Sequence, residues 1–125
     1  MRVFTIPTGP DEETDSAGVT LDQLPGALGA SMVNVTHVAA GGTLGRHAPR
    51  RRQVFAVLTG RGQVQASSGP PHDIEAGTFV LWEAGEEHQT WATTDMTAVV
   101  MENLGVLDFA GRFAEISLDA SLAND

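Results

Sequence analysis

From residue 31 onwards, apolar residues recur in short runs separated by turn-forming residues. β-Branched residues dominate Met32–Val38, and an unbroken apolar run lies within Gln53–Thr59. The second pattern is typical of a strand that is covered on both faces. Further short strands are expected at Val3–Ile6, Thr43–Ala48, Gly62–Ala66, Phe79–Trp82, His88–Ala92 and Thr97–Asn103. A series of short strands with turn signals about every 8–12 residues predicts an all-β barrel or sandwich.

The segments on either side of this series have weaker patterns. Residues 8–18 are polar and acidic, which predicts a flexible surface loop. Val3–Ile6 ends at a proline and is expected to be an edge strand. Near the other end, the spacing of three apolar residues predicts a short helix or turn packed on the barrel; these residues are Phe109, Phe113 and Ile116. No repeat or linker divides the 125 residues, so one domain spanning 1–125 is expected.

The composition argues against several classes of function. Sixteen Asp and Glu residues stand against seven Arg and no Lys, for a formal net charge of −9. Such a charge repels phosphate backbones and anionic lipid, so neither nucleic acid nor a membrane is expected as a partner. The absence of Cys excludes disulfides, thiolate ligands and cysteine nucleophiles. The N-terminus has no signal-peptide pattern and no stretch reaches the roughly 20 apolar residues of a membrane span, so a cytoplasmic location is expected.

Glycines and histidines in the strand-rich region are spaced in a way that resembles the two motifs of the cupin superfamily. These motifs are commonly written G-x5-H-x-H-x3–4-E-x6-G and G-x5-P-x-G-x2-H-x3-N. The positions that match are Gly41, His47, Gly60, Gly77, Gly85 and His88. The resemblance covers residues 31 to 104 or so. It implies a double-stranded β-helix, or jelly-roll barrel, of the RmlC-like type, with a pocket between two sheets and frequent assembly into homodimers.

The chain departs from these motifs at functionally important positions. Pro49 stands where the second His of the first motif belongs, and Gln53 replaces its Glu. In the family, the two His and the Glu of the first motif join the His of the second around a divalent metal ion. Carried over by position, the resemblance implies His47, Gln53 and His88 as the remaining metal ligands. The second motif departs at two positions, where Glu83 replaces Pro and Ala92 replaces Asn.

Two imidazoles and one amide oxygen suit a borderline divalent ion with open positions for water or substrate. This donor set discriminates weakly among Zn, Mn, Fe, Ni, Co and Cu, and no organic cofactor is expected. The resemblance to cupins implies, as one hypothesis, a small metal-dependent enzyme of the dioxygenase, isomerase or lyase type. The alternative is a non-catalytic module that binds a small ligand in a metal-free pocket, where His47 and His88 form hydrogen bonds with each other or with Gln53. The sequence leaves open whether the chain is an enzyme.

Strand alternation assigns neighbours to these candidate ligands. His47 is expected to share its face with Gly45 and Thr43, and Gln53 to share its face with two pocket residues. His37 either lines the pocket, completes the ligand set left short by Pro49, or is an ordinary core or edge residue. The residues expected to line the pocket are Phe55, Val57, Phe79 and His37.

Two further features have both a functional and a simpler interpretation. Glu102 alternates with Val100; if it faced the cavity it could act as a metal ligand or general base, and solvent exposure is the simpler expectation. The run Arg50–Arg52 could steer an anionic substrate, and a solvated loop is the simpler expectation. His72 follows two prolines and is expected in an exposed loop.

Overall fold

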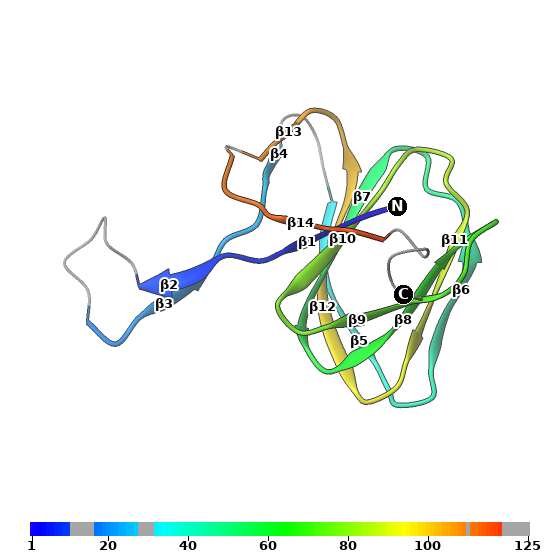
Figure 1. Cartoon of the computed structure of the whole chain (residues 1–125), viewed down its shortest axis with the longest axis horizontal. Coiled ribbons are helices and arrows are strands. Elements are labelled where there is room, and N and C mark those ends of the chain that lie inside the picture. The colour runs from blue at the N-terminus through cyan, green and yellow to red at the C-terminus, as the bar shows by residue number, and fades with distance from the viewer. Residues whose placement is uncertain (11–16, 28–31, 110, 119–125) are drawn as a thin grey trace.

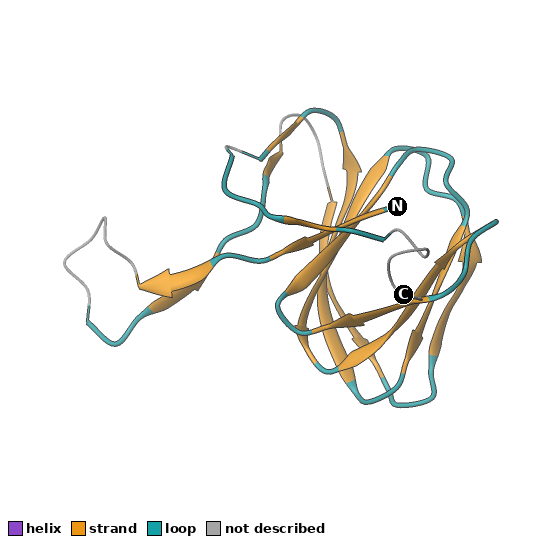
Figure 2. Cartoon of the chain, viewed as in Figure 1, coloured by secondary structure: helices purple, strands orange, loops and turns teal. Residues whose placement is uncertain are grey.

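Short antiparallel strands follow one another along the chain in the computed structural model, which describes residues 1–10, 17–27, 32–109 and 111–118 (Figure 2). The described residues contain no helix, and hence none that is long and apolar enough to cross a membrane. The strands are β1 (Arg2–Thr5), β2 (Thr8–Pro10), β3 (Thr20–Asp22), β4 (Gly26–Ala27), β5 (Met32–Val38), β6 (Thr43–His47), β7 (Arg52–Thr59), β8 (Arg61–Ala66), β9 (His72–Glu75), β10 (Thr78–Trp82), β11 (His88–Ala92), β12 (Met96–Leu104), β13 (Leu107–Asp108) and β14 (Glu115–Ile116).

Two sheets form the body of the molecule. The larger has six strands in the order β14-β1-β10-β7-β12-β5, and the smaller has four in the order β6-β11-β8-β9. Figure 1 shows the two sheets facing each other across a common interior. This arrangement confirms the expected all-β jelly-roll fold.

The inner core follows the two-residue period of the strands. On β7, Phe55 and Val57 face the smaller sheet, whereas Val54 and Ala56 face outwards. Both faces are buried, which explains why the sequence of this strand is apolar without interruption. The buried members of the inner core are Val3, Val38, Phe55, Val57, Val64, Ile74, Val80, Trp82, Ala92, Met96, Ala98 and Val100.

A second buried cluster covers the outer face of the larger sheet. Phe4 on β1 stacks on Phe79 of β10, with ring centroids 5.0 Å apart. Phe109 and Phe113, which follow β13, pack against these rings at 5.1 and 5.5 Å. Of the helix or turn expected after residue 108, the structure therefore shows a turn, stabilised by a hydrogen bond from Arg112 N–H to the Phe109 carbonyl. The chain then enters the short strand β14.

Three expectations for the remaining segments were wrong. β1 is an inner strand, because β14 pairs with its other edge. Thr8–Pro10, expected in a loop, forms β2, which pairs with β3 as an arm that projects from the body (Figure 1); residues 11–16 of that expected loop lie outside the described residues. His72 begins β9, which pairs with β8 at the edge of the smaller sheet.

Candidate functional site

The two motif histidines are direct neighbours on adjacent strands. His47 ends β6 and His88 begins β11, and the two residues are cross-strand partners with ring centroids 4.5 Å apart. The register shifts between His88 and Thr90, so that β6 contributes an extra residue there. This bulge places Leu44, rather than the expected Gly45 and Thr43, on the same side as His47.

Both imidazoles are oriented by backbone carbonyl groups. The Nδ1 atom of His47 lies 2.7 Å from the Gly45 oxygen, and that of His88 lies 2.9 Å from the Glu86 oxygen. A carbonyl oxygen only accepts hydrogen bonds, so each Nδ1 carries a proton, and the neutral form of each ring has its lone pair on Nε2. Histidines that bind metals in proteins are commonly held in this way.

His88 lies against the aromatic face of Trp82. Its side chain is 3% exposed, and the two rings stack in parallel with centroids 4.0 Å apart and 7° between their planes. Burial lowers the pKa of His88 below its ordinary value, and the nearby charge of a protonated His47 acts in the same direction. The hydrogen bond to the Glu86 carbonyl opposes this shift without cancelling it. His88 is therefore kept neutral, as a metal ligand or hydrogen-bond acceptor must be.

The histidines open on a cavity of about 140 Å³ between the two sheets. Of the residues expected to line the pocket, Phe55 does so, whereas Val57 lies in the inner core away from the cavity lining. Phe79 pairs with Ala56 and faces the opposite, outer side of the sheet, so its assignment to the pocket was wrong. His37 is exposed on β5, where its Nδ1 lies 3.2 Å from Thr97 Oγ1. The cavity is lined by Asn34, Thr36, Leu44, His47, Gln53, Phe55, Trp82, His88, Thr90, Val100 and Glu102.

Glu102 is half-buried and lines this cavity, whereas full exposure to solvent was the simpler expectation. Alternation along β12 puts it on the same side as Val100, and Val100 points into the interior. Its Oε1 lies 3.4 Å from Gln53 Nε2, and its Oε2 lies 3.4 Å from Asn34 Nδ2. The alternation was visible in the sequence, but the sequence did not show which face of β12 is internal. Trp82 and Asn34 were also missed, because neither belongs to a motif position.

Gln53 has an unusual polar environment. Its side chain is buried, and its Oε1 is the one buried side-chain oxygen or nitrogen without a hydrogen-bond partner among the described residues. An unsatisfied buried acceptor costs about 1–3 kcal/mol, so an unpartnered atom of this kind in a native protein requires an explanation. A cation or a ligand donor next to this oxygen would remove the cost.

Three side-chain atoms at the cavity fit a metal site that has few protein ligands. The Nε2 atoms of His47 and His88 and the Oε1 of Gln53 form a set of two nitrogens and one oxygen, which suits a borderline divalent ion. Within the described part of the chain, no three His, Asp or Glu side chains lie close enough to hold a metal by themselves. A metal here would therefore depend on the amide of Gln53 and keep positions for water or substrate.

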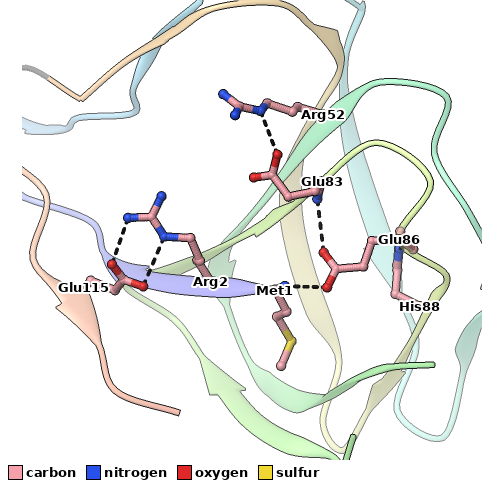
Figure 3. A network of polar contacts seen from close by, with 7 residues as sticks. All are labelled: Met1, Arg2, Arg52, Glu83, Glu86, His88 and Glu115. Atoms are coloured by element: carbon pink, nitrogen blue, oxygen red, sulfur yellow. Dashed lines mark hydrogen bonds and ion pairs between the residues drawn. The ribbon is translucent and has the colours of Figure 1, made fainter. Parts of the chain in front are cut away.

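The loop that leads into His88 is held by polar contacts with neighbouring segments (Figure 3). Arg52 Nε donates to the Glu83 carboxylate at 2.8 Å, and Glu83 N–H donates to Glu86 Oε1 at 3.1 Å. The amino group of Met1 forms an ion pair with the other Glu86 oxygen. Glu83, which departs from the motif, thus ties the loop of His88 to the strand of Gln53.

Pro49, the other departure, also supports this loop. Its carbonyl oxygen accepts a hydrogen bond of 2.8 Å from Gly85 N–H, which links the turn before β7 with the turn before β11. Arg50 and Arg51 are exposed beside it, whereas Arg52 is half-buried in its ion pair with Glu83. Pro49 cannot bind a metal through its side chain, but its backbone carbonyl helps to hold the loop before His88.

Comparison with known proteins places the chain in a family. The family model of the cupin domain matches residues 34–104, more than half of the chain, and the chain therefore belongs to the cupin family. A search of proteins with curated functions finds no match.

Solved structures agree with this assignment at the level of the fold. A cupin superfamily protein from Desulfitobacterium hafniense superimposes with a TM-score of 0.56 at 12% identity, over 63% of this chain and 74% of its own. A Klebsiella pneumoniae protein with a double-stranded β-helix domain gives a TM-score of 0.53 at 20% identity, over 66% and 77%. A predicted oxalate decarboxylase from Thermotoga maritima gives 0.54 at 22% identity, over 59% and 66%.

Proposed function

We propose that this cupin is a divalent-metal-dependent enzyme that acts on a small molecule through His47, Gln53 and His88. The observation that carries the proposal is the pair of imidazoles whose Nδ1 atoms are both occupied by backbone carbonyls. Their two Nε2 lone pairs are left for an electrophile in the same cavity. The unpartnered oxygen of Gln53 supports the same conclusion, because a cation would satisfy it.

Each part of the cavity has a chemical task in this proposal. A bound divalent ion would supply Lewis acidity and a compensating positive charge. The rings of Trp82 and Phe55 form apolar walls that exclude water and strengthen electrostatic interactions inside. Asn34 and Thr36 supply polar groups on β5 that orient a ligand. Burial keeps His88 neutral and therefore able to bind a cation at neutral pH.

The size of the cavity supports a very small substrate. A volume of about 140 Å³ is close to the roughly 150 Å³ of an engineered protein cavity that binds benzene, so a ligand with about six non-hydrogen atoms fits. The Thermotoga maritima neighbour is named as a predicted oxalate decarboxylase, and oxalate is an acid of that size. We therefore propose a small carboxylic acid as substrate and a lyase reaction, with the cation offsetting the charge of Glu102.

Metal analysis of protein purified without an affinity tag tests this proposal. We expect close to one divalent ion per chain in the wild type, and a loss of at least tenfold in affinity for added Co²⁺ in His47→Ala and in His88→Ala. His72→Ala, which removes a histidine on β9, is the matched control and should bind as the wild type does. Substoichiometric metal that neither site variant changes would overturn the proposal.

A metal-free binding pocket is the second candidate function. It is favoured by the absence, in the described part of the chain, of three clustered His, Asp or Glu side chains. In this case Nε2 of His47 and His88 would accept hydrogen bonds from an organic ligand. Isothermal titration of metal-depleted protein with small acids and their amides distinguishes the two functions, because the metal-dependent enzyme should lose its affinity for acids on depletion.

A further inference from the structure

Gln53 and Glu102 both line the cavity and lie in contact, and the carboxylate is on a different strand from that of the family motif. The motif has its carboxylate at the position of Gln53, on β7. This chain instead has a carboxylate on the neighbouring strand β12, with Glu102 Oε1 at 3.4 Å from Gln53 Nε2. The cavity therefore contains a carboxylate group, although not at the motif position.

The contact determines which way the Gln53 amide faces. A carboxylate only accepts hydrogen bonds, so the NH2 group of Gln53 must face Glu102 and its oxygen must face the other way. The reverse orientation would bring acceptor oxygens together. Asn34 Nδ2 donates to the other carboxylate oxygen at 3.4 Å, so Glu102 is held between two amide groups on two strands. The oxygen of Gln53 is consequently left buried and without a donor.

We infer that Glu102 is a positioning residue, which keeps the amide oxygen of Gln53 rather than its NH2 group available to a divalent cation at His47 and His88. This inference rests on the proposed function. Glu102 acts through Gln53 and Asn34, and its negative charge also lies in the field of the cation. Outer partners of metal ligands typically change metal affinity by about 10–100-fold when removed.

Titration of the full chain with Co²⁺ tests this role. Glu102→Leu removes the acceptor and frees the Gln53 amide to rotate, so we expect affinity to fall by about 10–100-fold. Glu102→Gln keeps the shape but loses the charge, and should show a smaller fall. Glu75→Gln removes one carboxylate from exposed β9 and is the control for net charge; its affinity should equal that of the wild type. Circular dichroism verifies folding, and Glu102→Gln is the fallback if Glu102→Leu does not fold.

A double exchange separates positioning from a general structural effect. Gln53→Glu/Glu102→Gln returns the carboxylate to the motif position, and the new amide at position 102 can donate to it. We expect Co²⁺ to bind this variant at least as tightly as the wild type. If Glu102→Leu lost affinity for Co²⁺ only because its fold was disturbed, we would not expect the double exchange to restore binding.

The outcomes distinguish the inference from the proposed function. Wild-type protein that binds no Co²⁺ overturns the proposed function, and the inference with it. Wild-type binding together with unchanged affinity in both Glu102→Leu and Glu102→Gln overturns the inference alone. An equal loss in Glu75→Gln overturns it as well, because net charge would then explain the effect.

Discussion

His88 is a buried ionisable side chain that lines the cavity, and its contacts favour one protonation state. Trp82 covers one face of the ring, and the Glu86 carbonyl occupies Nδ1. Protonation would place a positive charge on a ring that is almost completely shielded from bulk solvent. The lowered pKa of His88 is the consequence of this burial.

The stability of the protein should therefore depend on pH through His88. Below pH of about 6.5, the unfolded chain binds a proton at this ring while the folded chain does not. The contribution of the neutral His88 ring to the free energy of unfolding should be complete above that pH. It should decrease as the pH falls towards the lowered pKa of the folded state. Urea denaturation between pH 7.5 and 5.5 measures the decrease. His88→Asn should have a shallower dependence on pH, and His72→Asn should follow the wild type; equal slopes in all three would contradict the assignment.

At the scale of elements, the motif glycines are not equivalent. Gly60, between β7 and β8, has a φ of +83°, and a Cβ added there would lie 2.0 Å from the Asp95 carbonyl oxygen. Gly41 has a similar φ of +81° but no heavy atom within 4 Å of an added Cβ. Gly60 is therefore required both by its backbone conformation and by the close approach of a neighbouring chain segment, whereas Gly41 is required by conformation alone.

Alanine substitutions should rank these positions by stability. Gly60→Ala combines backbone strain with a clash against backbone atoms, so we expect the free energy of unfolding to fall by more than about 4 kcal/mol. Gly41→Ala should lose only about 1–2 kcal/mol, the cost of a left-handed conformation. Gly45→Ala has neither problem and should change stability by less than about 1 kcal/mol. Chemical denaturation gives the three values, and a Gly60→Ala loss no larger than that of Gly41→Ala would contradict the explanation.

The elements were more predictable from the sequence than the faces they present. Strands β5, β7 and β10 follow from their apolar and β-branched runs and from the turn residues between them. The face of Phe79 does not, because its strand is buried on both sides and offers no contrast between polar and apolar positions. The outer face of this strand is covered by Phe109 and Phe113, which lie far along the chain. Their position depends on tertiary packing.

The same limit applies to the site. His47, Gln53 and His88 were selected by motif spacing, and the structure brings them to one cavity. Glu102 was not assigned to the cavity, because its orientation depends on which side of β12 packs against the smaller sheet. The role of Pro49 was equally invisible, since it acts through its backbone carbonyl.

At the scale of the whole molecule, the outer face of the larger sheet is only partly covered. One row of cross-strand partners runs from Phe4 through Phe79, Ala56 and Val99 to Val35. Phe4, Phe79 and Ala56 are buried, Val99 is half-buried, and Val35 is 60% exposed. All five residues are apolar. The residues that pack on the outer face therefore cover only part of its apolar surface and leave the end at Val35 exposed.

Two other features of the chain have strand edges that are unpaired within the described residues. β5 is an edge strand, paired only with β12. The β2–β3 arm projects from the body and pairs only with itself, with Leu21 41% exposed (Figure 1). A two-stranded hairpin alone is marginally stable in water. A second copy of the chain would cover both features at once if both lay in a two-fold interface, because such an interface places the same surfaces of the two copies in contact.

We therefore expect a homodimer in which the β2–β3 arm and the exposed end of the outer face, at β5, are both buried. Val35→Glu and Leu21→Glu each place a charge in this interface and should give monomers, whereas the wild type should sediment with twice the mass of the chain. Ile116→Glu, at the opposite edge of the same sheet, is the matched control and should remain dimeric. Analytical ultracentrifugation measures all four proteins. The expectation fails if the wild type is monomeric, or if Val35→Glu and Leu21→Glu leave the dimer intact.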